Sequence, residues 1–255
     1  MAGYENFSTV YDALMADINY PEQAKRLLRL FERYDRRPTL LLDLACGTGN
    51  FSAPLAAEGV EVIGVDCSPG MLAVAQSKRQ NPQNPLFLCQ RAEELDLFGT
   101  VDGAICMLDS LNHLTSYAGF AKALKRTALF LEPGRLFIFD LNTPYKHQKI
   151  LNNNTFVRQE MCIRDRRQGD GAFCVWQNAR QGNTVEVLLD LFVKQPGTNL
   201  FARRTEEFSE RAYTPREVER ALQAAGLTPV AVLDETGAAP QKNSERLVYI
   251  TKKDH

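Results

Sequence analysis

The apolar positions of this chain follow two patterns, short continuous runs and longer stretches with a spacing of three to four residues. The short runs, which are typical of buried strands, occupy residues 40–44, 61–66, 85–89, 101–107 and 136–140. Stretches with helical periodicity lie among and after them, at residues 22–34, 51–57, 117–131 and 215–226. Strands that alternate with helices in this way favour an α/β fold with a mostly parallel sheet.

The pattern changes between residues 145 and 213. Four further strand-like runs are separated by turn signals at residues 169–171, 181–183 and 195–197. These runs occupy residues 155–160, 171–177, 184–194 and 200–208. We predict an inserted antiparallel meander that forms a lid over the site, where a substrate is selected. The domain prediction is therefore a helical cap (1–36), an α/β domain (37–144 and 214–255) and an inserted lid (145–213).

Several lid residues are candidates for contact with a substrate. They are Trp176, Arg203, Glu207, Arg211 and Tyr213. For each one, a role without a ligand is the preferred interpretation. The tryptophan would anchor the lid by packing, and the charges would lie on a solvated face of the sheet.

The stretch from residue 40 to residue 52 predicts a buried strand, a tight turn and the start of a helix. Gly47 and Gly49 in the turn permit backbone conformations, and a closeness of approach, that a side chain forbids. The next strand ends in Asp66, where a carboxylate is placed to accept hydrogen bonds from the ribose hydroxyls of a nucleoside. Ser68 and Pro69 then predict an N-cap and a first helical residue. A purely structural turn is the alternative interpretation.

The segments DLACGTG (43–49) and VIGVDCSPGML (62–72) together resemble the class I S-adenosylmethionine-dependent methyltransferases. This resemblance implies a doubly wound, Rossmann-like sheet whose last strand is antiparallel, with S-adenosylmethionine as the cofactor. It also implies that Asp66 binds the ribose and that Asp43 orients the amino acid end through water. The other cofactor contacts that it implies in these two segments are Ala45, Cys46, Gly47, Gly49, Cys67 and Met71.

The same resemblance extends to later strands. The exit of the third strand, Gln90-Arg91-Ala92, would meet the adenine ring, although Arg91 stands where the family often has an acid. The adenine contact therefore falls to Gln90 or to the backbone of Ala92. Leu108 and Asp109, after the fourth strand, would close the side of the pocket that holds the methyl donor. Glu93 and Glu94 are interpreted as a solvated helix start.

Both ends of the chain resemble one group of bacterial small-molecule methyltransferases. The N-terminal pattern is VYDALMADINYP and the C-terminal pattern is EEFSERAYTPREVERALQAAGL. In the group, the N-terminal helix caps the cofactor pocket, so Tyr11 becomes a candidate contact for cofactor or substrate. Packing is an equally weighted alternative for Tyr11. Thr214 and Glu217 predict a capping box at the last helix.

Polar residues gather after the fourth and fifth strands, where ligands of open α/β sheets bind. Asp109, Ser110, Asn112 and His113 follow one strand, and Asn142 follows the other. If methyl transfer requires a general base, the candidates are Asp109, His113 and Tyr11, in no order. An acceptor that is already deprotonated needs no base, and Asp109 or Ser110 could also cap the next helix.

Composition limits the class of partner. The formal net charge of −1 gives no basic field for a nucleic-acid backbone, and the Asp/Asn-Pro-Pro-aromatic signature of base methylation is absent. No apolar run approaches the roughly 20 residues of a membrane helix, and no export signal is found at the start, so we expect a cytoplasmic protein. Six cysteines without a CxxC pair predict reduced thiols, and three distant histidines give little support to a metal site. Small-molecule, protein and RNA acceptors all stay open, and a small molecule is favoured because the predicted lid could enclose it.

Three alternatives to methyl transfer stay open. A nicotinamide-dependent oxidoreductase would have a third glycine where Ser52 stands. A non-catalytic S-adenosylmethionine-binding module would not need the polar residues that are predicted on the acceptor side. Transfer of another group from a modified cofactor, such as an aminopropyl or carboxymethyl group, would use the same fold.

Overall fold

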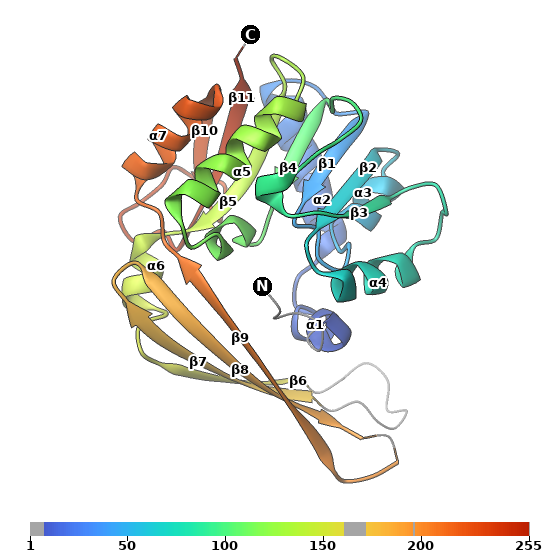
Figure 1. Cartoon of the computed structure of the whole chain (residues 1–255), viewed down its shortest axis with the longest axis vertical. Coiled ribbons are helices and arrows are strands. Elements are labelled where there is room, and N and C mark those ends of the chain that lie inside the picture. The colour runs from blue at the N-terminus through green and yellow to red at the C-terminus, as the bar shows by residue number, and fades with distance from the viewer. Residues whose placement is uncertain (1–7, 161–171, 196, 255) are drawn as a thin grey trace.

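The computed structural model describes residues 8–160, 172–195 and 197–254, which fold into two sheets (Figure 1). The larger sheet has the strand order β10-β11-β5-β4-β1-β2-β3, and the smaller one has the order β6-β7-β8-β9. In Figure 1 the smaller sheet extends away from the larger one beyond α6, and α1 lies between the two sheets. The predicted turn at residues 169–171 and Cys162 lie outside the described residues.

The larger sheet is mostly parallel, as predicted. Its strands are β1 (Leu40–Leu44), β2 (Glu61–Asp66), β3 (Leu86–Cys89), β4 (Gly103–Cys106), β5 (Leu136–Asn142), β10 (Leu227–Asp234) and β11 (Arg246–Lys253). Strand β1 pairs in parallel with both β2 and β4, so the strand order reverses direction between β1 and β4. Strand β11 is antiparallel to both of its neighbours, β5 and β10. The predicted Rossmann-like sheet with a reversed last strand is confirmed.

Helices cover both faces of this sheet because its central strands are apolar on both sides. Leu42 and Leu44 face the side packed by α5 (Tyr117–Phe130) and α7 (Pro215–Ala225). Leu41, one residue out of phase, faces α2 (Tyr20–Tyr34) and α3 (Ser52–Ala57). Alternation of period two therefore assigns each β1 leucine to one of two cores.

Two helix starts follow the predicted local chemistry. The Ser68 side chain caps α4 (Pro69–Lys78) by accepting the backbone N–H of Met71, and Pro69 is the first helical residue. Thr214 and Glu217 form the predicted capping box of α7, whose end is closed by Gly226 in the left-handed conformation. Such caps each stabilise a helix by about 1 kcal/mol.

The smaller sheet is the predicted antiparallel insertion. It consists of β6 (Thr155–Glu160), β7 (Ala172–Gln181), β8 (Thr184–Lys194) and β9 (Phe201–Arg211). Its buried face shares an apolar cluster with α1 (Ser8–Leu14) and α4, in which Leu14 and Met71 meet Val187 and Leu189. The smaller sheet is thus packed against α1 and α4.

One element between the two sheets was not predicted. Residues 144–149 form a helix, α6 (Pro144–Lys149), where the sequence interpretation began the β insertion. Thr143 caps this helix by accepting the backbone N–H of Lys146, and Pro144 is its first residue. The remaining helical pieces are two 3₁₀ turns, η1 (Ala92–Glu94) and η2 (Ser110–His113).

The five described cysteines are free thiols. Across the described ranges, no helix is both long enough and apolar enough to cross a membrane.

Candidate functional site

A cavity of about 440 Å³ lies at the carboxyl ends of the parallel strands. Its wall is built from the loops after β1, β2, β3 and β4, from α1 and α6, and from the inner face of β7, β8 and β9. Most of the predicted cofactor residues line it, namely Tyr11, Ala45, Gly47, Asp66, Cys67, Met71, Gln90, Arg91, Ala92, Leu108 and Asp109. A smaller cavity of about 30 Å³ shares several of these residues and is also lined by Asp43 and Cys46.

Gly47 and Asp66 meet at the wall of the larger cavity. The backbone N–H of Gly47 donates to Asp66 Oδ2 at 2.9 Å, and that of Ser68 donates to Oδ1 at 2.8 Å. Burial raises the pKa of Asp66, and these backbone donors partly offset the rise. Gly47 has φ +55°, and a Cβ built on it would have no atom within 4 Å, so the space beside its backbone is open. The fixed carboxylate and the open backbone fit a ribose.

Gly49 is closely packed, and its contact with the cofactor stays a prediction. A Cβ at this position would come within 3.0 Å of the Phe87 ring and within 3.2 Å of the Ala75 side chain. Gly49 lines neither cavity. The close approach that requires a glycine here is therefore between the turn, β3 and α4, and it is a packing requirement.

Asp43 lies behind the turn, at the small cavity. Its side chain is buried, and Oδ2 accepts the Ser52 hydroxyl at 2.5 Å. Burial raises the pKa of Asp43 to about 7. A 30 Å³ polar cavity is large enough for a water molecule. The role of Asp43 in orienting the amino acid end of the cofactor through water stays a prediction. The small cavity has room for that water molecule.

The third-strand exit also lines the cavity. The Gln90 amide is fixed by two hydrogen bonds with the Asp96 backbone. Arg91 forms an ion pair with Glu93 at 2.9 Å, and Glu93 also lines the cavity. The sequence interpretation placed both Glu93 and Glu94 at a solvated helix start. Of these two residues, Glu94 is the exposed one. The adenine contact stays a prediction, to which Glu93 is now added.

The loop after β4 has an unusual backbone. Leu108 and Asp109 both have positive φ, at 58° and 53°. Left-handed backbone at residues other than glycine costs on the order of 1–3 kcal/mol each and persists only where the surroundings hold it. Here the Asp140 carboxylate, at the end of β5, accepts the backbone N–H groups of Leu108 at 3.2 Å and of Asp109 at 2.6 Å. The loop is held in a defined conformation beside the cavity.

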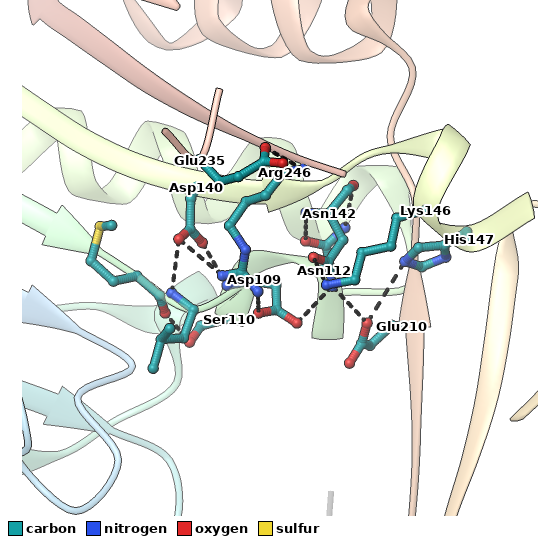
Figure 2. Close-up of polar contacts among 12 residues, drawn as sticks. Asp109, Ser110, Asn112, Asp140, Asn142, Lys146, His147, Glu210, Glu235 and Arg246 are labelled. Atoms are coloured by element: carbon teal, nitrogen blue, oxygen red, sulfur yellow. Dashed lines mark hydrogen bonds and ion pairs between the residues drawn. The ribbon is translucent and has the colours of Figure 1, made fainter. Parts of the chain in front are cut away.

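Arg246, the first residue of β11, forms ion pairs with two carboxylates in this region (Figure 2). Its Nη1 lies 3.0 Å from Asp140 Oδ2, and its Nη2 lies 2.5 Å from Asp109 Oδ1. Burial alone would raise the pKa of Asp109, but the charges of Arg246 and Lys146 hold it below its usual range. Asp109 is therefore ionised at neutral pH.

The Asn142 amide joins Asp109 to a second carboxylate, Glu210 of β9 (Figure 2). Asn142 Nδ2 donates to Asp109 Oδ2 at 2.7 Å and to Glu210 Oε2 at 3.3 Å, while its Oδ1 accepts Lys146 Nζ at 3.0 Å. Burial, together with the charge of Asp109, raises the pKa of Glu210 to about 8. The two carboxylates are thus driven to opposite protonation states.

His147 of α6 lies on the far side of Glu210, with Nε2 3.7 Å from Oε2. Burial lowers the pKa of His147 to about 4. Because the imidazole is neutral at pH 7, the contact is not an ion pair under that condition.

The other two candidate bases also line the cavity. Burial raises the pKa of the Tyr11 phenol far above its usual range, so that it keeps its proton at neutral pH and is a donor. Burial lowers the pKa of His113, which is therefore a neutral imidazole packed on the Phe208 ring at 5.0 Å.

Of the lid candidates, only Trp176 lines the cavity. Arg203 pairs with Asp190, and Arg211 pairs with Glu217. Tyr213 is buried and stacks on Phe120. The lid instead contributes Glu210, Phe208 and Leu189, none of which the sequence interpretation selected.

Lys146 and Arg246 are further cavity residues that sequence reasoning missed. For Glu210, strand alternation was the available signal, since it shares a face of β9 with Phe208. Lys146 lies on the helix that was not predicted.

A network on the other side of the turn ties α1 to the larger domain. Asp12 Oδ1 accepts the Thr48 hydroxyl at 2.6 Å and the Asn50 amide at 2.9 Å. Its Oδ2 lies 2.6 Å from Lys78 Nζ on α4. This network fixes α1, and with it Tyr11, over the glycine turn.

Comparison with known proteins agrees with the sheet order and the glycine turn. A family described as "Methyltransferase domain" matches residues 41–134. The chain belongs to the class I S-adenosylmethionine-dependent methyltransferases, and S-adenosylmethionine is its cofactor. The predicted family and cofactor are confirmed.

Particular relatives cover nearly the whole chain. It is 30% identical over 252 residues to "Putative methyltransferase YqeM" of Bacillus subtilis, covering 98% of this chain and 97% of that one. It is 29% identical to a crystal structure of an S-adenosylmethionine-dependent methyltransferase from Clostridium acetobutylicum, with a TM-score of 0.86 and 99% of each chain covered. A dTDP-3-amino-3,6-dideoxy-alpha-D-glucopyranose N,N-dimethyltransferase of Streptomyces fradiae is 26% identical, with 82% and 78% covered.

Proposed function

We propose that this methyltransferase acts on a small organic molecule that is enclosed between the two sheets. The observation that carries the proposal is the shared cavity, in which Asp66 and Gly47 of the larger domain and Trp176 and Phe208 of the lid line one space of about 440 Å³. Pockets of this size and mixed lining are typical for small ligands. The dimethyltransferase of Streptomyces fradiae, whose named substrate is a nucleotide sugar, adds support.

The residues of the cavity fit S-adenosylmethionine. Asp66 would bind the ribose, the backbone of Ala45 and Gly47 would lie against the cofactor, and Leu108 and Asp109 would lie where the methyl donor meets the acceptor. The cofactor supplies a methyl group that its sulfonium has already activated. The chain then has to align the acceptor for in-line attack, which can contribute roughly 7–11 kcal/mol in favourable cases. The wall formed by the smaller sheet would exclude water from this region once the ligands are bound.

Calorimetric titration tests the cofactor assignment at Asp66. S-adenosylhomocysteine and S-adenosylmethionine should bind the wild-type protein, and NAD should not. Replacing Asp66 by Ala removes two charge-assisted hydrogen bonds to the ribose and should weaken both affinities by about 100-fold or more. Glu61→Ala, at the exposed opposite end of the same strand, is the matched control and should bind as the wild type does. Undiminished binding by Asp66→Ala would remove the ribose assignment.

Size fractionation tests the acceptor class. The purified enzyme and methyl-labelled S-adenosylmethionine are incubated with an extract that is divided into a small-molecule filtrate and a macromolecular retentate. Label should enter only the filtrate. Label that is incorporated into protein or RNA would contradict the small-molecule proposal, and no incorporation in either fraction would favour a binding module without catalysis.

A further inference from the structure

Two carboxylates of opposite protonation state share one amide at the acceptor side of the cavity. Asp109 and Glu210 each accept a hydrogen bond from Asn142 Nδ2, at 2.7 Å and 3.3 Å respectively (Figure 2). Both carboxylates line the cavity. They come from different parts of the fold, the loop after β4 and the end of β9. The sharing of one NH₂ group places the two carboxylates within a single ligand's reach.

The charges around this pair do not balance. We use the name acceptor cluster for Asp109, Asp140, Lys146, Glu210 and Arg246. It contains three carboxylates and two cations, and Arg246 is already bound to two of the carboxylates. Lys146 Nζ is hydrogen-bonded to the Asn142 amide oxygen. One negative charge therefore remains to be compensated, either by a proton on Glu210 or by a cation that enters the cavity.

We propose that the methyl acceptor is an amine, bound as an ammonium ion between Asp109 and Glu210, and that Glu210 is the general base that removes its proton. The inference rests on the proposed function, because it names the acceptor class of the same site. Asp109, which is held ionised by Arg246, supplies the permanent negative charge. Glu210 supplies the charge that changes during the reaction.

The proton and electron balance is simple. A bound R–NH₃⁺ transfers one proton to the Glu210 carboxylate, which becomes a neutral carboxyl group, and the amine nitrogen gains a free lone pair. This lone pair forms the new N–C bond to the methyl group while the S–C bond of the cofactor breaks, and the electron pair of that bond stays on sulfur. The product leaves as R–NH₂–CH₃⁺.

Proton affinities favour an amine over an alcohol. The pKa of Glu210 is raised to about 8, and that of an alkylammonium is about 10. The equilibrium constant for proton transfer from the ammonium to Glu210 is therefore unfavourable by only about 10²-fold. For a hydroxyl with a pKa near 16 the corresponding factor is about 10⁸-fold. A general base works best when its pKa approaches that of the group it deprotonates. The groups that set the titration of Glu210 are Asp109, Asn142, Lys146 and Arg246, and His147 lies beside it.

Two cofactor analogues test the charge of this site without an acceptor. Sinefungin carries an ammonium group where S-adenosylmethionine carries its methylsulfonium, whereas S-adenosylhomocysteine has an uncharged thioether. The wild type should bind sinefungin roughly tenfold more tightly than S-adenosylhomocysteine, because the ammonium group meets two carboxylates. Calorimetry at pH 7 in buffers of different ionisation enthalpy should show proton release with sinefungin, from Glu210, and almost none with S-adenosylhomocysteine.

Glu210→Gln keeps the shape of the side chain and removes its charge. This variant should lose both the sinefungin preference and the proton release while its affinity for S-adenosylhomocysteine stays within about twofold. Glu207→Gln changes the same residue type on the exposed face of the same strand, and should behave as the wild type does.

Each outcome separates this inference from the proposed function. Proton release that persists in Glu210→Gln would overturn the assignment of the base. Absence of proton release in the wild type would overturn it as well, even if the variant did not fold. Failure of the wild type to bind S-adenosylhomocysteine would refute the cofactor site, and the inference with it. Normal binding together with label transfer to an alcohol in the fractionated extract would refute only the amine.

Discussion

Replacing Arg246 by Leu would show how strongly the last strand stabilises the acceptor side. Arg246 pairs with Asp109 at 2.5 Å and with Asp140 at 3.0 Å, and the side chains of the two acids are only 16% and 4% exposed. Leucine retains apolar packing but leaves both carboxylates without their cation. Breaking a buried pair in this way costs about 3–5 kcal/mol. For a chain of this size we expect the Tm at pH 7 to fall by about 10 °C.

The fall in Tm should depend on pH. The direction of this dependence follows from the linkage between protonation and folding. In the wild type the pKa of Asp109 is held below its usual range, so its contribution to stability is present above pH ~4 and is lost as the pH falls through the lowered value. Without Arg246, burial raises that pKa instead. The folded variant can then take up a proton on Asp109. This protonation reduces its loss of stability as the pH falls towards about 3.9, the pKa of an aspartate in the unfolded chain. The Tm difference should therefore narrow between pH 7 and pH 5.

Thermal unfolding followed by circular dichroism at both pH values measures this difference. Arg29→Leu is the matched control, because Arg29 pairs with Glu22 on the exposed side of α2, where an ion pair contributes at most about 1 kcal/mol. A Tm for Arg246→Leu within the range of that control at pH 7 would refute the buried-pair reasoning. A difference that widens at pH 5 would refute the sign.

Three further substitutions, one of them a control, address the cofactor side. Gly47→Ala and Gly59→Ala each place a side chain at positive φ in open space and should each lose about 1–2 kcal/mol of stability. Only Gly47→Ala should also bind S-adenosylhomocysteine more weakly, because Gly47 lines the cavity, and equal affinities in calorimetry would contradict this. Asp12→Ala removes the bonds to Thr48, Asn50 and Lys78 and should speed dissociation of the same ligand in stopped-flow measurements, whereas an unchanged rate would show that α1 does not retain the cofactor.

Features that depend on neighbours in sequence were predictable from sequence. The capping box of Thr214 and Glu217 uses residues three apart, and the Ser68 cap acts on a backbone N–H of the same turn. The strand that ends at Asp66 is a continuous apolar run with a polar end. Such features are determined by local chemistry, which a tertiary contact does not override here.

The acceptor cluster was not predictable in this way. Lys146, Glu210 and Arg246 come from three elements that are distant in sequence, and each resembles an ordinary surface charge when it is read alone. For β9 the interpretation named Arg203, Glu207 and Arg211 and preferred a solvated face for their charges, but it did not name Phe208 or Glu210, which line the cavity. Because a strand reverses its faces with every residue, a shift of one residue decides whether a side chain meets the cavity or the opposite face.

The reversed direction of β11 explains how a residue so late in the chain joins this site. In the register with β5, Arg246 lies opposite Asn142, so the first residue of β11 is beside the carboxyl end of β5. A parallel strand in the same place would bring its last residue, Lys253, to that end. The antiparallel strand therefore supplies the cation that fixes Asp109, and Asp140 on the neighbouring strand fixes the left-handed loop. The position of this cation at the acceptor side is thus a consequence of strand direction.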